Sequence, residues 1–279
     1  MRIDLHLHTA GSHDCLVRPE AALERARARG VHRIAITDHD RLGVARRLAQ
    51  RHPGEVIPGE EVKTAEGVDV IGLYLREEIP GGTPAEETCW RIRTQGGLVY
   101  LPHPYARGKG GGGALIPRIL PWVDVVEVRN GRLRPRSLNA RAEALARAEG
   151  LPAGAGSDAH TRGEGGGCWV EVPEHPNEPE ALRTALAGAV VGGRTAPPWV
   201  VVASTWAKVR QRLPGFVPPE GTTGAAGDPD LFGGMGLRAD ERIRSALASG
   251  EAVAQARPRG VLRFSETTIA KGHPWRRTR

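Results

Sequence analysis

The amino-acid sequence predicts an α/β fold in which parallel strands are enclosed by helices. Short apolar, β-branched runs alternate with amphipathic stretches from residue 1 to about residue 200. Six or seven such strand–helix units favour a barrel over an open sheet, although a doubly wound sheet is the alternative. A chain of 279 residues, of which 39% are hydrophobic, can bury the core of one large domain plus an appendage.

The expected elements follow from this alternation. Strands are expected at residues 3–8, 33–37, 55–62, 68–75, 98–101, 123–128, 153–156 and 169–172. Helices are expected at residues 19–29, 42–50, 84–94, 115–120, 138–148, 178–187 and 201–213. Pro19 suits a first helical turn and Gly30 a helix end. Asp38 or Asp40 is expected to cap the helix that begins near residue 42.

The composition divides the chain into residues 1–213, the expected barrel, and residues 214–279, an expected extension. Residues 214–236 are rich in Gly and Pro and are expected to form a linker, followed by an amphipathic helix at 238–250. Residues 257–279 carry seven Lys and Arg against one acid, within a chain of net charge +7. A solvated basic tail is the simpler interpretation, and a tail that binds nucleic acid is the alternative.

Three widely spaced cysteines indicate the compartment. Cys15, Cys89 and Cys168 form no CxxC pair, which argues against a disulfide framework or a zinc ribbon and favours a reducing cytoplasm. The sequence begins in a strand-like segment without a signal peptide, and no apolar run is long enough to cross a bilayer. A soluble cytoplasmic protein is therefore expected, with no role for a membrane.

Histidines gather where predicted strands end. His6, His8, His39, His103 and His160 each stand at or just after the carboxyl end of a strand, where the active sites of parallel barrels form. Alternation along a strand places His6 and His8 on one face, which suits two ligands of one ion, although a lone HxH motif is weak.

Carboxylates accompany these histidines. Asp14 lies in the first loop, Glu60 and Glu61 end the third strand, and Asp158 precedes His160 by two residues. Two adjacent acids can also form a solvated turn. Five strand ends that all supply His, Asp or Glu nevertheless predict a site for Zn²⁺, Mn²⁺ or Fe²⁺.

Six motifs in this order resemble the polymerase-and-histidinol-phosphatase (PHP) family. They are DLHLHT at 4–9, SHD at 12–14, ITDHD at 36–40, PGEEV at 58–62, LPHP at 101–104 and GSDAH at 156–160. The resemblance runs from residue 2 to about residue 213. It implies a distorted (β/α)7 TIM-like barrel, a phosphoesterase activity, and a centre of two or three divalent ions.

Carried over by motif, the resemblance assigns the ligands. His6, His8, Glu61 and Asp158 are implied to hold one ion, and Glu61 to bridge to a second ion beside His103. A third ion is implied at Asp14, His39 and His160, with His13 as the alternative to Asp14. One departure concerns the strand after Glu61, where the family often has His and this chain has Asp69, so two ions rather than three is an open alternative.

The expected reaction is hydrolysis of a phosphate ester by a metal-activated water. His160 or His39 could act as general acid, with Asp158 beside them. Arg107, Arg129, Arg162 and Asn130 are expected to contact substrate, although each could equally be a loop residue. Residues 107–113 are expected to form a lid over the site.

The expected substrates are phosphorylated small molecules, nucleotides, nucleoside bisphosphates or short RNA or DNA ends. A histidinol-phosphate-type phosphatase, a non-catalytic metal-stabilised module that binds nucleic acid or protein, and metal-dependent C–N hydrolysis are the alternatives.

Overall fold

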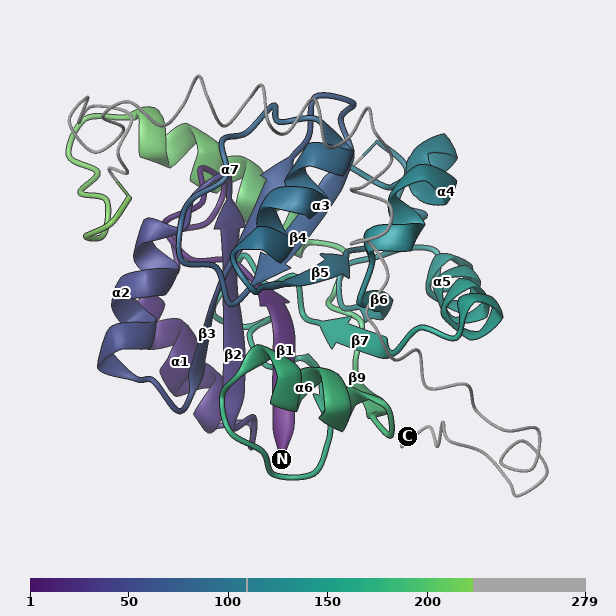
Figure 1. Cartoon of the computed structure of the whole chain (residues 1–279). Coiled ribbons are helices and arrows are strands. Elements are labelled where there is room, and N and C mark those ends of the chain that lie inside the picture. The colour runs from purple at the N-terminus through teal and green to yellow at the C-terminus, as the bar shows by residue number, and fades with distance from the viewer. Residues whose placement is uncertain (109, 223–279) are drawn as a thin grey trace, which may run out of the picture.

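One mixed sheet of nine strands organises the computed structural model, which describes residues 1–108 and 110–222 (Figure 1). The strand order is β7-β6-β5-β4-β3-β2-β1-β8-β9. The bounds are β1 Arg2–Leu7, β2 Arg33–His39, β3 Val56–Lys63, β4 Asp69–Leu73, β5 Leu98–Leu101, β6 Val125–Asn130, β7 Ala153–Gly156, β8 Cys168–Glu171 and β9 Val190–Gly193.

The sheet curls until its seventh strand meets its first, so the fold is a nearly closed barrel. The amide of His8 donates to the carbonyl oxygen of Ala159 over 3.0 Å, and the amide of Asp158 donates to that of His6 over 2.7 Å. These bonds join the end of β1 to the segment that follows β7. The α/β barrel expected from the sequence is confirmed.

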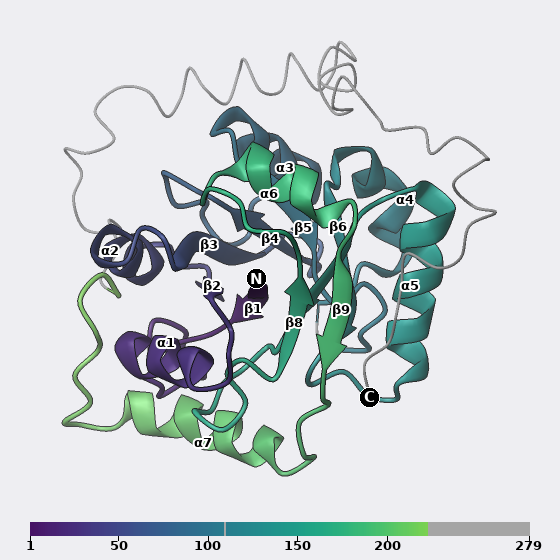
Figure 2. The same ribbon diagram turned by 90° about the horizontal axis from the view of Figure 1, so that it is seen from below.

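Seven helices surround the sheet among the described residues, with two 3₁₀ turns beside α4 (Figure 2). Their bounds are α1 Pro19–Arg27, α2 Gly43–Arg51, α3 Ala85–Thr94, α4 Ile116–Ile119, α5 Ser137–Glu149, α6 Pro179–Leu186 and α7 Val200–Arg212. All seven overlap helices expected from the sequence.

The strands are not all parallel, which corrects the expectation drawn from strand–helix alternation. β4 runs antiparallel to both β3 and β5, and β8 runs antiparallel to both β1 and β9. The connection from Lys63 to Asp69 is too short for a crossover helix, so β3 and β4 can pair only as a hairpin.

The sequence analysis missed β9. Two of its four residues are glycines, which have low strand propensity. Gly192 is required there because a Cβ would overlap the ring of Trp169 on β8. Packing across the pair therefore decides a strand that its own residues do not indicate.

The expected cap of α2 is also wrong. The residue before α2 is Leu42, and no side chain caps the helix. Asp38 instead accepts from the amide and the hydroxyl of Thr9, both over 2.6 Å, and Asp40 accepts from the amide of Lys63 over 2.8 Å. Both acids are committed to neighbouring strands and loops.

Two apolar cores support this arrangement. One joins Leu5, Ile57 and Tyr100 of the strands to Leu182 and Leu186 of α6, which lies across the amino-terminal end of β1 (Figure 1). The other packs the outer face of the sheet against α1, α2, α3 and α5. The cores leave the opposite end of the barrel, where β1 and β2 finish, to polar residues.

The last described helix, α7, packs on the barrel through small residues. Its buried residues are Val200, Ser204 and Ala207, and Arg132 donates to Ser204 Oγ over 3.0 Å. The assignment of residues 214–279 to a separate extension stays a prediction. The helix expected at 238–250 and the basic stretch at 257–279 lie outside the described residues.

Two further observations bear on the composition. Cys15, Cys89 and Cys168 are buried and free, as expected from their spacing. No helix between residues 1 and 222 combines the length and apolar character needed to cross a membrane.

Candidate metal centre

Histidines and carboxylates from the ends of five strands, or from the loops that follow them, converge at the end of the barrel nearest α7. Their donor atoms form three groups of mutually close atoms: His6, His8 and Asp158; His8, His39 and His160; and His6, Glu61 and His103. Together with Asp14, these groups contain every ligand expected from the sequence. The tertiary structure therefore brings all eight residues together, although the ligand assignment itself stays a prediction.

Glu61 lies at the middle of the cluster. Its Oε2 atom lies 3.2 Å from His6 Nε2, 3.2 Å from His8 Nε2 and 3.3 Å from His39 Nδ1. Its Oε1 atom lies 3.0 Å from His103 Nε2. A carboxylate whose two oxygens face different histidine groups has the geometry of a bridge between two ions.

The first group has three donors. Asp158 Oδ1 lies 3.8 Å from His6 Nε2 and 3.5 Å from His8 Nε2, and the two Nε2 atoms are 3.1 Å apart. Both rings are almost fully buried. A cation between these atoms would allow both imidazoles to present lone pairs without repulsion.

The outward nitrogens of three histidines are already occupied. His6 Nδ1 lies 3.1 Å from Glu127 Oε1, His8 Nδ1 lies 3.0 Å from Ser12 Oγ, and His160 Nδ1 lies 2.9 Å from the carbonyl oxygen of Asp158. An acceptor at Nδ1 places the ring proton there and leaves the Nε2 lone pair facing the cluster. Metal-binding histidines are oriented in this way.

The second group lies toward α7. Asp14 Oδ1 lies 3.3 Å from His160 Nε2, and Asp14 Oδ2 lies 3.9 Å from His39 Nε2. The side chain of His13 is exposed, so the structure places Asp14 rather than His13 in the cluster. Gln211 of α7 fixes this loop by donating to the carbonyl oxygens of Ser12 over 2.7 Å and Cys15 over 2.6 Å.

The third group is poorer in donors. His103 Nδ1 is buried without a hydrogen-bond partner, and its Nε2 faces Glu61. Asp69, at the start of β4, points toward the same two residues but bonds to Lys63 Nζ through Oδ1 over 2.8 Å. The carboxylate that replaces the expected histidine is therefore bound to an ammonium group.

Burial and neighbouring charges shift the pKa values of these groups in opposite directions. Burial lowers the pKa of His8, but Asp158 and Glu61 more than offset this and raise it to about 9. Burial likewise opposes ionisation of Glu61, yet His6, His39 and His103 hold its pKa well below the ordinary value. Burial lowers the pKa of His39 to about 3, so its ring is neutral at pH 7.

The backbone is strained at the same place. Four non-glycine residues of the described chain have positive φ, and His103 (24°) and Asp158 (51°) are two of them. Asp40 (51°) directly follows His39. Left-handed conformations cost about 1–3 kcal/mol each and concentrate at functional sites, where surrounding contacts hold them.

The donor set fits divalent metal ions. Nitrogen and carboxylate oxygen donors are the ligands of Zn²⁺, Mn²⁺ and Fe²⁺. Buried atoms without a hydrogen-bond partner, Asp14 Oδ1 and His103 Nδ1, lie among them. Two charged imidazoles at 3.1 Å would repel each other, which a shared ion avoids.

The four residues expected to contact substrate are scattered. Asn130 is buried and donates to Glu127 Oε2 over 3.0 Å and Asp158 Oδ2 over 3.3 Å, so it contacts an expected ligand rather than open space. Arg162 lies 3.8 Å from Glu24 of α1. Arg129 lies near Cys168. Burial raises the pKa of the Cys168 thiol to about 12, and the positive charge of Arg129 opposes this rise. Arg107 is exposed on the loop after β5.

Two residues at the site, Glu127 and Ser12, have roles that were not expected from the sequence. Glu127 on β6 accepts from His6, Tyr100, the amide of His103 and Asn130, all within 3.1 Å. The hydroxyl of Ser12 accepts from His8 Nδ1 and donates to Asp38 Oδ1. Glu60 is buried, and its Oε2 atom accepts from the amide of Ile79. The solvated-turn reading of Glu60 and Glu61 is wrong, since both are buried. An acid in the middle of a buried strand was the available signal for Glu127.

Gly110, in the loop expected to form a lid, contacts β4. The amide of Asp69 donates to the carbonyl oxygen of Gly110 over 2.7 Å. A Cβ on Gly110 would overlap the Asp69 carboxylate, and its φ of 73° also favours glycine. This contact places the described end of the loop beside the third group.

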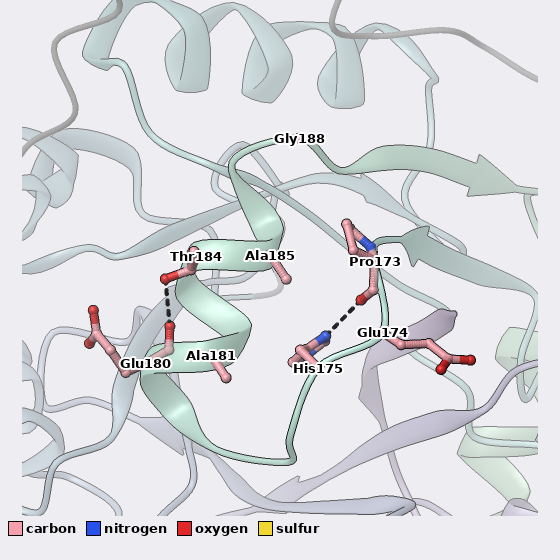
Figure 3. A pocket seen from close by; sticks show the side chains of 8 residues that line it. All are labelled: Pro173, Glu174, His175, Glu180, Ala181, Thr184, Ala185 and Gly188. Carbon is pink, nitrogen blue, oxygen red and sulfur yellow. Dashed lines mark hydrogen bonds between the residues drawn. The ribbon is translucent and has the colours of Figure 1, made fainter.

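A hollow of about 540 Å³ lies elsewhere, between α6 and the loop that precedes it (Figure 3). His175 in its wall is already bonded, through Nδ1 to the carbonyl oxygen of Pro173 over 2.9 Å and through Nε2 to Arg33 over 3.0 Å. Thr184 bonds to the backbone of its own helix. This hollow brings together no reactive cluster, so the chemistry belongs to the strand ends.

Comparisons with known proteins agree with this geometry. The sequence model of the PHP domain matches residues 4–75, and that of a PHP-associated region matches residues 136–190. Uncharacterized protein MJ0417 of Methanocaldococcus jannaschii is 36% identical over 179 residues, which cover 62% of this chain and 71% of the relative. MJ1587 of the same organism is 40% identical over 119 residues, covering 38% of this chain and 69% of the relative.

Solved structures share the fold at low identity. PsfC from Pseudomonas syringae has a TM-score of 0.55 and 19% identity, covering 75% of this chain and 98% of that protein. A two-domain protein from Bacteroides vulgatus, which contains a predicted PHP-like metal-dependent phosphoesterase, has a TM-score of 0.54 and 17% identity over 75% and 69% of the two chains. An amidohydrolase from Chromobacterium violaceum with bound sulfate has a TM-score of 0.50 and 21% identity, with coverage of 67% and 96%.

Proposed function

The chain belongs to the PHP domain family, and from that premise we propose that it is a metal-dependent hydrolase of phosphate esters. The proposed substrates are nucleotides, nucleoside bisphosphates or 5′ ends of short nucleic acids. The observation that carries the proposal is the position of Glu61, whose Oε2 atom lies 3.2 Å from His6 Nε2 of the first group and 3.3 Å from His39 Nδ1 of the second group. Such a bridge is the feature that two-metal hydrolysis needs.

The proposed ligands follow the three groups. His6, His8, Glu61 and Asp158 would hold one ion, and Asp14, His39 and His160 would hold another. Divalent ions, when bound there, supply an activated water and neutralise charge on phosphoryl oxygens.

The chain's own residues would orient these ligands and move protons. Glu127, Ser12 and the carbonyl oxygen of Asp158 hold three imidazoles in the tautomer that faces inward. His160 and His39 are the candidates for donating a proton to the leaving group. Each could do so only where its ring is not committed to a metal ion.

One comparison independently supports a phosphate-like anion as the group that the site binds. The related fold from Chromobacterium violaceum binds sulfate, which resembles phosphate in shape and charge. That protein is also described as an amidohydrolase, so C–N hydrolysis is the competing reaction and enters the test.

The test is phosphate release from mononucleotides, nucleoside bisphosphates and short 5′-phosphorylated RNA in the presence of Mn²⁺. His8→Ala removes a ligand, and His52→Ala, at the end of α2 outside the cluster, is the matched control. We expect turnover by the parent and by His52→Ala and loss of at least about 10²-fold in His8→Ala. A metal-loaded parent that releases no phosphate but hydrolyses amides, or does neither, would contradict the proposal.

A further inference from the structure

We propose that the Lys63–Asp69 ion pair occupies the place of a third metal ion, so that the centre of this chain holds two. The inference rests on the metal centre of the proposed function but not on its substrate. Lys63 lies outside the ligand motifs. In this inference its ammonium group supplies a fixed positive charge beside Glu61 and His103.

Strand register puts the pair at the cluster. Lys63 and Asp69 are directly opposite in the antiparallel β3–β4 ladder, two positions beyond the pair of Glu61 and Ile71. Because side chains alternate between faces, Lys63 and Asp69 share the face of Glu61. Asp69 therefore points toward the group of Glu61 and His103 rather than toward solvent.

One oxygen of Asp69 is paired with an ammonium group and the other is packed against the backbone. Lys63 Nζ lies 2.8 Å from Oδ1, and the backbone of Gly110 fills the space beside Oδ2. Only 5% of the Asp69 side chain is exposed, so its charge needs a partner, which Lys63 supplies. A metal ion at this position would have to displace the ammonium group.

The other two groups keep their donors. Asp158 and Asp14 contact histidines, and within residues 1–108 and 110–222 neither makes a hydrogen bond to a Lys or Arg side chain, although Lys208 Nζ lies 3.8 Å from Asp14 Oδ2. Without Asp69, the third group retains His103 and the Oε1 atom of Glu61, since His6 also faces the first group. Two protein donors are fewer than the three that catalytic zinc sites use.

Charge balance agrees with two ions. Among the described residues, the carboxylates with an oxygen within 4 Å of an imidazole nitrogen of the cluster are Asp14, Glu61, Glu127 and Asp158. Their four negative charges match two divalent cations. Asp69 is matched separately by Lys63, so a third divalent ion would leave uncompensated positive charge in a buried site.

The experiment counts metal ions per chain by elemental analysis after loading with Mn²⁺ or Zn²⁺ and desalting. The parent, Lys63→Met, Lys63→Gln, Asp69→Asn and the double variant Lys63→Met/Asp69→Asn are compared. Lys208→Met is the matched control, because Lys208 is also a rim lysine, 47% exposed against 46% for Lys63, and lies 3.8 Å from Asp14. Circular dichroism and thermal melting establish that each variant is folded.

We expect about two ions in the parent, Asp69→Asn, Lys208→Met and the double variant, and about three in Lys63→Met and Lys63→Gln, where Asp69 is free to bind. Three ions in the parent would overturn the inference. Two ions in both Lys63 variants, or three in the double variant or in Lys208→Met, would also overturn it. Phosphate release is measured separately on the same samples, so an inactive parent with the expected counts contradicts only the proposed function.

Discussion

Glu127 Oε1 lies 3.1 Å from Nδ1 of His6, and both side chains are fully buried. The carboxylate comes from the middle of β6 and the imidazole from β1, strands that are not neighbours in the sheet. Glu127 therefore fixes the tautomer of His6 from across the barrel. It also accepts a hydrogen bond from the amide of His103. One residue orients two members of the cluster.

Glu127→Gln is expected to weaken metal binding by about 10–100-fold, because an amide at this position no longer favours the Nδ1 proton of His6. Affinity is measured by competition with a chromogenic chelator. Glu149→Gln at the end of α5, far from the cluster, is the control and should match the parent. Equal affinity in Glu127→Gln would refute the orienting role.

Removal of metal is expected to lower the melting temperature. Ions that bind only the folded chain at about 100 times Kd add about 2.7 kcal/mol, which corresponds to about 5–10 °C for a domain of this size. Calorimetry with and without chelator measures the change, and re-addition of metal should restore it. In His8→Ala the chelator effect should be much smaller, whereas His52→Ala should behave as the parent does.

Gly156→Ala is expected to damage the site through packing alone. A Cβ at this position on β7 would overlap Cβ of His6 and lie 2.8 Å from Glu127 Oε1. Steric insertion of this kind costs about 1–3 kcal/mol, so both unfolding free energy and metal affinity should fall. Gly54→Ala, where a Cβ meets no atom within 4 Å, is the control, and equal loss in both variants would contradict the explanation.

Asp124→Ala is expected to destabilise the fold by about 3–5 kcal/mol without changing metal content. Asp124 at the start of β6 is buried, pairs with Arg93 of α3 over 3.0 Å and accepts from the amide of Val99 over 2.8 Å. Removal of the Asp124 carboxylate leaves the half-buried guanidinium of Arg93 without its ion-pair partner. Denaturant unfolding measures the loss.

The control for Asp124→Ala is an exposed pair of similar length. Arg118 lies 2.7 Å from Glu86, and both side chains are largely solvated. Arg118→Ala should cost less than about 1 kcal/mol. A comparable loss in the two variants would show that burial does not govern the strength of these pairs.

Much of the site could be predicted from sequence because its ligands lie in local patterns at strand ends. His6 and His8 share a face through strand alternation, and Asp158 and His160 are two residues apart. Once strands converge at one end of a barrel, such residues must meet. Position along a strand therefore carries most of the information about the eight expected ligands.

Substrate contacts could not be found this way. Arg129 and Asn130 end β6 and Arg162 follows β7, yet Arg162 faces Glu24 and Asn130 donates to Asp158. A long side chain on a loop takes the nearest partner, which local sequence does not specify. Of the four candidates, Arg107 and Arg162 are exposed, and Arg107 lies on the loop that reaches Asp69.

The sequence alone determined the α/β class, the helices and the donors at the strand ends, because those depend on periodicity and on residue chemistry at short range. The tertiary structure decided the antiparallel position of β4, the existence of β9, and the partners that hold the ligands in place. Those depend on distant contacts: Glu127 meets His6 only when the barrel closes, and Lys63 meets Asp69 only when β3 and β4 pair as a hairpin. Register and closure, rather than propensity, decide which charges share a buried space.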